Sequence, residues 1–202
     1  GDQQEDIFSH TAAQKIFSSG HEKIAIKLSD FPFECLIGTL YAEAAASFED
    51  ITLADTDDTL TRQDAGAWPN AFRKARFLSA VDHVQLDRLR MIAIDEMNAF
   101  FEDVDFIIGP MAVDSMLIVS NFTGHPCLQI PVGFEELATR NELSLASGKL
   151  ELGAPSDHGK KHLVPRGIGI WAQLFQEDKL ISFGKQIESL FKFFKNKPPN
   201  FS

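Results

Sequence analysis

Cysteine is scarce in this sequence, since Cys35 and Cys127 are the only two among 202 residues. Two cysteines cannot form the set of several disulfides that supports a small secreted domain. We therefore interpret both as buried thiols in a reducing compartment, which predicts a cytoplasmic protein. A single disulfide between them is the alternative.

Basic charge is also in short supply. The chain has 19 lysines and arginines against 29 aspartates and glutamates, which gives a formal net charge of -10. Nucleic acids and anionic membrane surfaces attract basic proteins, so this balance excludes both as expected partners. No apolar run is long enough to cross a bilayer.

The glycine motifs of nucleotide-binding proteins are missing. Gly167-Ile168-Gly169 lacks the third glycine of a dinucleotide-binding turn, and there is no phosphate-binding loop. No serine lies in a Gly-x-Ser-x-Gly elbow. We therefore expect no cofactor. Composition, with 44% hydrophobic residues, is that of a globular protein, and the length suits a single domain over residues 1–202.

Hydrophobic periodicity predicts an α/β fold, with a mixed sheet covered by helices. Four segments are expected to be strands: 23–28, 106–108, 128–132 and 167–171. Four are expected to be helices: 7–17, 36–51, 77–104 and 179–194. The polar segment 135–161 is expected to be a hairpin or a loop.

The helix expected over residues 77–104 is the strongest element. Its apolar residues recur at helical spacing and predict one face buried against the sheet. That face comprises Val81, Val84, Leu89, Ile92, Ala93, Met97, Phe100, Phe101 and Val104.

A polar turn at Asn121-Phe122-Thr123-Gly124-His125-Pro126 separates two apolar stretches, a position where α/β folds often bind ligands. His125 could act there as an acid or base, with Ser115, Ser120 or Cys127 as a nearby nucleophile. The alternative is structural: Gly124 and Pro126 shape the turn, and His125 packs or caps.

Three other motifs favour structural interpretations. His158 and His162 are four residues apart, but the glycine and lysines between them indicate a solvated loop instead of a zinc-binding helix, so no metal is expected. Ser18-Ser19-Gly20 is typical of a helix end. The local basic excess around Arg76 could bind a carboxylate, although most such charges are solvated.

Four stretches, taken in order, resemble the carboxyl-terminal half of amidase-signature proteins, a family that includes the A subunits of glutamyl-tRNA amidotransferases. The stretches are 23–48, 73–110, 121–134 and 165–201. The arginine-rich second stretch and the Pro198-Pro199-Asn200-Phe201 tail are more similar to bacterial amidases of unassigned substrate than to the tRNA-linked subunits.

The resemblance implies a hydrolase of carbon–nitrogen bonds in carboxamides. The family's catalytic serines and lysine lie in glycine- and serine-rich motifs of the amino-terminal portion, and none of these motifs occurs here. No catalytic residue is therefore carried over. The expected substrate-side residues in a complete enzyme are Asn121, Thr123, Gly124, His125 and Arg76.

The resemblance also predicts a partner for this chain. Without the amino-terminal portion it is expected to be incompetent in catalysis, and to associate with that portion or with a second copy of itself through apolar surface near residues 24–28 and 106–108. The alternative function is a non-catalytic module, derived from an amidase, that binds a ligand or a partner.

Overall fold

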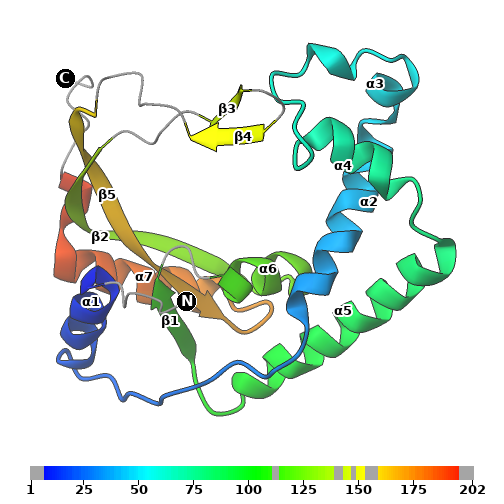
Figure 1. Cartoon of the computed structure of the whole chain (residues 1–202). Helices are drawn as coiled ribbons and strands as arrows, with labels where there is room; N and C mark the ends of the chain where they lie inside the picture. The colour runs from blue at the N-terminus through cyan, green and yellow to red at the C-terminus, as the bar shows by residue number, and fades with distance from the viewer. Residues whose placement is uncertain (1–6, 111–113, 139–142, 147–148, 153–158, 196–202) are drawn as a thin grey trace. The chain divides into compact units, whose positions relative to one another are not determined.

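The computed structural model describes the chain except for residues 1–6, 111–113, 139–142, 147–148, 153–158 and 196–202 (Figure 1). Its α-helices are α1 (Ile7–Phe17), α2 (Ile37–Ser47), α3 (Glu49–Leu53), α4 (Trp68–Ala75), α5 (Ala80–Phe100), α6 (Asp114–Thr123) and α7 (Glu177–Phe191). Its strands are β1 (Phe106–Pro110), β2 (Cys127–Ala138), β3 (Leu143–Ala146), β4 (Lys149–Leu152) and β5 (Lys161–Ala172). Short 3₁₀ turns occupy Phe33–Leu36, Asp57–Thr59 and Phe193–Lys195.

The chain divides into two compact units. The first contains residues 1–31, 93–137 and 162–202, and the second contains residues 32–92 and 138–161. The single domain expected from the length stays a prediction, because two compact units can belong to one domain that folds cooperatively.

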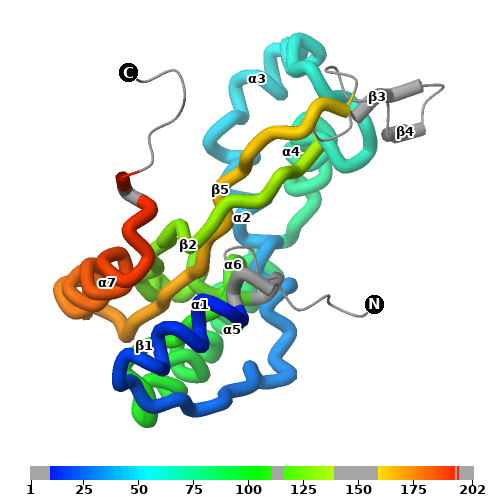
Figure 2. The backbone as a smooth tube through the Cα atoms, turned by 90° about the vertical axis from the view of Figure 1, so that its left-hand side faces the viewer, coloured from blue at the N-terminus to red at the C-terminus, as the bar shows by residue number. Residues whose placement is uncertain are grey.

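The first unit is built on a three-stranded antiparallel sheet in the order β1-β5-β2. β1 pairs with β5 so that Ile107 lies opposite Trp171. In Figure 2, β2 and β5 run side by side as two long strands. Three of the four strands predicted from sequence therefore exist, within a mixed α/β fold.

One face of this sheet carries the main core of the first unit. α1 and α7 cover that face, because their apolar stripes pack on alternate residues of β2 and β5. The core consists of Ala12, Ile16, Ile130, Val132, Ile168, Ile170, Ala172, Leu180, Phe183 and Ile187. Gly184 permits close contact of α7 with the sheet, since a Cβ there would lie 2.2 Å from Cδ2 of Leu128.

Trp171 and Ile107 face the opposite side of the sheet from this core, as the alternation of side chains along a strand requires. Trp171 is buried, and its indole occupies the space beside Gly169 that a side chain would otherwise fill. Any residue larger than glycine at position 169 would collide with the ring.

The prediction of a fourth strand over residues 23–28 is wrong. This segment is irregular, and Ile24 and Ile26 are exposed. Alternating apolar residues form a strand only when a neighbouring strand accepts and donates the backbone hydrogen bonds. No strand in the described part of the chain pairs with this segment.

The second unit is mainly helical. α2 packs on α4 through Tyr41, which meets Trp68 edge to face at 6.1 Å between ring centroids. Phe48, the residue that follows α2, stacks on Phe72 of α4 at 5.4 Å. Trp68 itself is half exposed. The hairpin predicted within 135–161 is confirmed by β3 and β4, which pair antiparallel in this unit.

The expectation of one continuous buried face on α5 is wrong in its first half. Ala93 and Met97 are fully buried, whereas Val84 is 53% exposed and Ile92 is also exposed. α5 passes from the second unit to the first at residues 92 and 93, so its two halves pack in different surroundings. A single apolar stripe along the whole helix is therefore not required.

Candidate functional site

The Asn121–Pro126 segment contains the last residues of α6 and the turn that leads from it to β2 in the first unit. Gly124 has a φ of 78°, a left-handed conformation that glycine adopts without strain. Its N–H donates to the Ser120 carbonyl at 3.1 Å, which ends the helix, and the Pro126 carbonyl accepts from the N–H of Ala172 at 3.1 Å. The turn is thus fixed to β5 by its own backbone.

His125 is buried in this turn, with 3% of its surface exposed. Its Nδ1 lies 2.8 Å from Oγ1 of Thr123, and its Nε2 lies 3.3 Å from Oδ1 of Asn98 on α5. The ring of Phe101 stacks on the imidazole at 5.4 Å between centroids. Both ring nitrogens therefore have polar partners, and one face of the ring is covered.

The hydroxyl of Thr123 determines which ring nitrogen of a neutral His125 carries the proton. It donates to the Val119 carbonyl at 2.9 Å, so it can only accept from His125. A neutral His125 then carries its proton on Nδ1 and leaves Nε2 as an acceptor, which the Asn98 amide would satisfy only with its N–H₂ in the place that Oδ1 occupies. Burial lowers the pKa of His125 below its usual 6.5, which favours this neutral form.

The suggested nucleophiles do not pair with His125. Ser120 donates its hydroxyl to the Met116 carbonyl at 2.8 Å, and the thiol of Cys127 lies 3.1 Å from Nε2 of Gln129. Desolvation raises the pKa of the Cys127 thiol, which leaves less of the nucleophilic thiolate. The side chain of Ser115 lies outside the described residues.

Both cysteines are exposed and free, so the expectation of buried thiols is wrong. Cys35 lies on a 3₁₀ turn and Cys127 at the start of β2, and in each case neighbouring residues of the element fill the core instead. The disulfide alternative is not formed either.

The residues predicted to face a substrate occupy different environments. Thr123 and His125 are buried and bonded to each other, whereas Asn121 is exposed and donates from Nδ2 to the Leu117 carbonyl at 2.7 Å. Arg76 belongs to the second unit, where its Nη1 lies 2.7 Å from Oε1 of Glu49. Four of the five expected residues are thus together at the end of α6 and in the turn that follows it.

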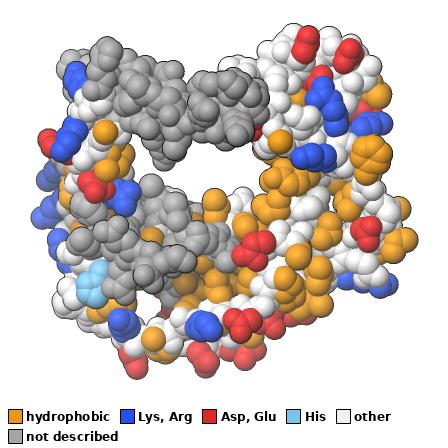
Figure 3. All heavy atoms as spheres, in the orientation of Figure 1, with side chains coloured by type: hydrophobic (Ala, Val, Ile, Leu, Met, Phe, Trp, Pro, Cys, Tyr) orange, Lys and Arg blue, Asp and Glu red, His pale blue; other side chains and the backbone are white. Residues whose placement is uncertain are grey.

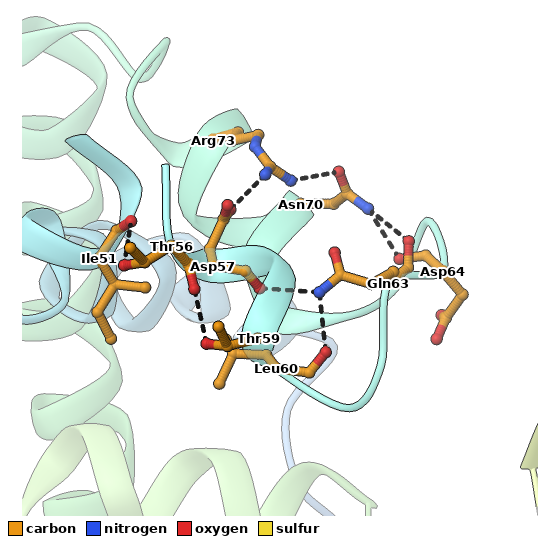
Figure 4. Close-up of polar contacts among 9 residues, drawn as sticks. All are labelled: Ile51, Thr56, Asp57, Thr59, Leu60, Gln63, Asp64, Asn70 and Arg73. Carbon is orange, nitrogen blue, oxygen red and sulfur yellow. Dashed lines mark hydrogen bonds and ion pairs between the residues drawn. The ribbon is translucent and has the colours of Figure 1, made fainter. Parts of the chain in front are cut away.

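Neighbouring Arg73 has a structural partner. Its guanidinium forms an ion pair with the buried carboxylate of Asp57 and also donates to Oδ1 of Asn70 at 3.3 Å (Figure 4). Asn70 and Gln63 in turn bind backbone carbonyls of the 57–64 loop. Acidic and basic side chains intermix on the surface over α3 and α4 in Figure 3, so the basic cluster seen in the sequence is locally neutralised.

A cleft of about 400 Å³ lies next to the His125 network in the first unit. Asn98 and Phe101, which contact His125, also line the cleft. Its other lining residues are Glu102, Val104, Asp105, Phe106, Gln173, Gln176 and Lys179. Sequence reasoning missed this cleft, because its walls come from segments about seventy residues apart and no motif marks either.

No metal centre is formed by the described residues, since they contain no group of three histidine, cysteine or acidic side chains suited to an ion. His162 lies at the start of β5, and His158 falls outside the described residues. Within the described part of the chain, no helix is both long and apolar enough to span a bilayer.

Comparison with known proteins gives no match to a protein family or to a curated protein by sequence. Solved structures do match. A 6-aminohexanoate cyclic dimer hydrolase aligns with 98% of this chain at a TM-score of 0.65 and 15% identity. An amidase family protein from Bacillus anthracis str. Ames aligns with 100% at 0.61 and 13% identity.

A bacterial aryl acylamidase of the amidase signature family aligns with 95% of the chain at a TM-score of 0.58 and 15% identity. The fold is therefore that of part of an amidase-signature enzyme. The chain spans only 44%, 38% and 42% of the lengths of these three structures, respectively.

Proposed function

We propose that this chain is the carboxyl-terminal portion of an amidase-signature hydrolase, resembling the amidotransferase A subunits, that cleaves the carbon–nitrogen bond of a carboxamide. One observation carries the proposal: the chain aligns almost end to end with 38–44% of the length of such enzymes. The ordered sequence stretches that resemble the family's carboxyl-terminal half provide independent support.

In this proposal catalysis needs the amino-terminal portion, because the serines and lysine of the family have no counterpart in this sequence. The Asn121–His125 turn and Arg76 are proposed to lie on the substrate side of the complete enzyme. Because Thr123 and His125 are buried, we assign them a positioning role in which they hold the turn rigid.

The proposed partner is the amino-terminal amidase portion. In its absence, the proposed partner is a second copy of this chain. β1 supports this, since one of its edges pairs with β5 and the other has no strand beside it among the described residues. Exposed Ile24 and Ile26 add apolar surface in the same unit. An open strand edge and exposed apolar side chains each favour association.

The experiment is to express the chain alone and the chain extended through its upstream reading frame, and to measure ammonia release from a panel of carboxamides. We expect turnover only from the extended protein, and its loss when the serine of the upstream glycine- and serine-rich motif becomes alanine. Light scattering should show the chain alone to be associated at micromolar concentration.

The second candidate function is a non-catalytic binding module. Its supporting observation is that His125 has no nucleophile partner among the described side chains. An upstream reading frame without a glycine- and serine-rich motif, or an extended protein with no turnover, would favour the module. Hydrolysis by the chain alone that is lost in His125→Ala would contradict both candidates.

A further inference from the structure

The first half of α5 is apolar on two sides. One side packs within the second unit, where the side chain of Leu86 lies so close to Gly38 of α2 that a Cβ on this glycine would be 2.8 Å from it. Leu89 lies three residues further along, on the same side of the helix, and is also partly buried. This side holds the helix to its own unit.

The other side of α5 carries exposed apolar side chains. We call this set the α5 stripe; its members are Val81, Val84, Arg88, Met91 and Ile92. The four apolar members are 48% to 68% exposed. Positions 81, 84, 88 and 91 follow one another at intervals of three, four and three residues, so they share one face of the helix. Leu86 lies two residues from both Val84 and Arg88 and therefore faces the opposite way.

The spacing of the α5 stripe is suited to another α-helix as its partner. Alternating intervals of three and four residues allow two helices to pack side by side, with each side chain between residues of the facing helix. Over residues 81–92 the stripe is about 18 Å long, at a rise of about 1.5 Å per residue. A strand edge or a small ligand would need no such spacing.

The charges of the α5 stripe favour a second copy of this chain as that helix. Arg88 lies in the middle of the stripe and forms no ion pair with another described residue, and Asp87 lies at its flank. In an antiparallel pair with a two-fold axis near residue 86, Val81 of each copy lies opposite Met91 of the other. Arg88 lies opposite Val84 in the same way, and its guanidinium is within reach of Asp87 of the other copy. The stripe is therefore self-complementary, and one pairing brings together two opposite-charge pairs.

From the exposed apolar side chains, their helical spacing and the self-complementary charges, we propose that residues 81–92 of α5 form a dimer interface in which two copies of this chain pair antiparallel. The contact is short, and Asp87 already has a partner within the chain, the exposed Arg90. We therefore expect a weak dimer, with a Kd of about 1–100 μM. This surface is distinct from the β1 edge, and the proposal does not rest on the hydrolase function.

The test is analytical ultracentrifugation of the whole chain over a range of concentrations around the expected Kd, where a monomer–dimer equilibrium should be seen. Val84→Glu should raise the Kd by at least about tenfold, because each dimer would then bury two unpaired carboxylates. Leu53→Glu is the matched control, since Leu53 is an exposed apolar residue on α3 of the same unit and is not part of the stripe. Ile24→Glu tests association through the other exposed apolar segment. The proposal is overturned if the chain is monomeric throughout, or if either of these two variants weakens the dimer as much as Val84→Glu.

Two charge reversals test the antiparallel pairing itself. Asp87→Arg and Arg88→Glu should each raise the Kd by about two- to tenfold, because like charges would then face each other across the axis. An equimolar mixture of the two variants should dimerise more tightly than either variant alone, since the mixed pair again brings opposite charges together. A mixture that associates no better than its components would overturn the pairing. Far-UV circular dichroism shows whether each variant is folded, and all the replaced side chains are exposed.

The chain extended through its upstream reading frame tests whether another occupant covers the α5 stripe. A dimer of the extended protein that Val84→Glu dissociates supports the proposal, whether or not that protein hydrolyses carboxamides. If the extended protein is a monomer and Val84→Glu lowers its free energy of unfolding, the upstream portion covers the stripe and the proposal is overturned.

Discussion

Nδ1 of His125 lies 2.8 Å from Oγ1 of Thr123, and the threonine hydroxyl is already committed to the Val119 carbonyl. The imidazole is therefore the donor of this bond. Because the side chain is buried, a second proton on Nε2 would place a charge where water cannot solvate it. The neutral ring is thus part of the folded state.

This arrangement predicts a dependence of stability on pH. Burial lowers the pKa of His125 in the folded protein, whereas in the unfolded chain it is about 6.5. Between these two values the unfolded chain binds more protons, so the free energy of unfolding falls as the pH drops below about 6.5. In urea unfolding, the free energy of unfolding should fall less between pH 7.5 and pH 5 for His125→Gln than for the parent protein.

The exposed His83 provides the control for this measurement. His83→Gln should keep the pH dependence of the parent. His125→Gln should also be less stable at pH 7.5 by about 1–3 kcal/mol, because buried partners lose a hydrogen bond. If the free energy of unfolding falls equally with decreasing pH in the parent and in His125→Gln, a group other than His125 causes the loss of stability.

Gly169→Ala should destabilise the first unit through a collision. An added Cβ would lie 2.4 Å from Cη2 and 2.8 Å from Cζ3 of the Trp171 ring, and a buried indole cannot turn aside easily. Overpacking of this kind costs about 1–3 kcal/mol. Gly66→Ala is the matched control, since the nearest atom to its added Cβ is Oδ1 of Asp64 at 3.4 Å, which is ordinary van der Waals contact. Chemical denaturation should separate the two variants.

The two halves of α5 should respond differently to truncation. Met97→Ala removes a fully buried side chain and should cost about 2–5 kcal/mol. Val84→Ala lies on the exposed part of the helix and should change stability by less than about 0.5 kcal/mol. If urea unfolding shows a larger loss of stability for Val84→Ala than for Met97→Ala, the continuous buried face expected from periodicity is correct after all.

Replacement of Arg73 should destabilise the protein more than replacement of Arg76, because the acidic partner of Arg73 is buried and that of Arg76 is exposed. Arg73→Met leaves the buried carboxylate of Asp57 without its counterion and should cost about 1–3 kcal/mol. The Arg76 pair with Glu49 is exposed on both sides, so Arg76→Met should cost less than about 1 kcal/mol. Thermal unfolding of both variants at low and high salt compares the two losses of stability. Equal losses for Arg73→Met and Arg76→Met would contradict the structural role of Arg73.

Periodicity predicted those elements whose residues face a single environment. α1 and α7 were found from the helical spacing of their apolar residues, which pack on one core. The strands around Ile107, Ile130 and Ile170 were found from short apolar runs, which the sheet buries. The segment 23–28 shows the limit of this signal. Its alternation is that of a strand, but the sequence does not show whether a partner strand lies beside it.

The turn at His125 was identified from its residue types, although its partner Asn98 was not. Asn98 lies 27 residues earlier on α5, and only the packing of α5 against the turn brings the two together. The cleft was missed for the same reason. Gln173 and Asp105 are ordinary polar residues in the sequence and become a candidate site only through long-range packing.

The chain has two tryptophans, and each compact unit holds one. Trp171 is 2% exposed and Trp68 is 49% exposed, so their fluorescence in the folded protein should differ, with the emission of Trp171 at shorter wavelength. Trp68→Phe and Trp171→Phe therefore give two proteins, each with one built-in optical reporter for one unit. If the two emission changes coincide along a urea titration, the units melt together as one cooperative domain; two separate midpoints would mean that each unit holds its fold by itself.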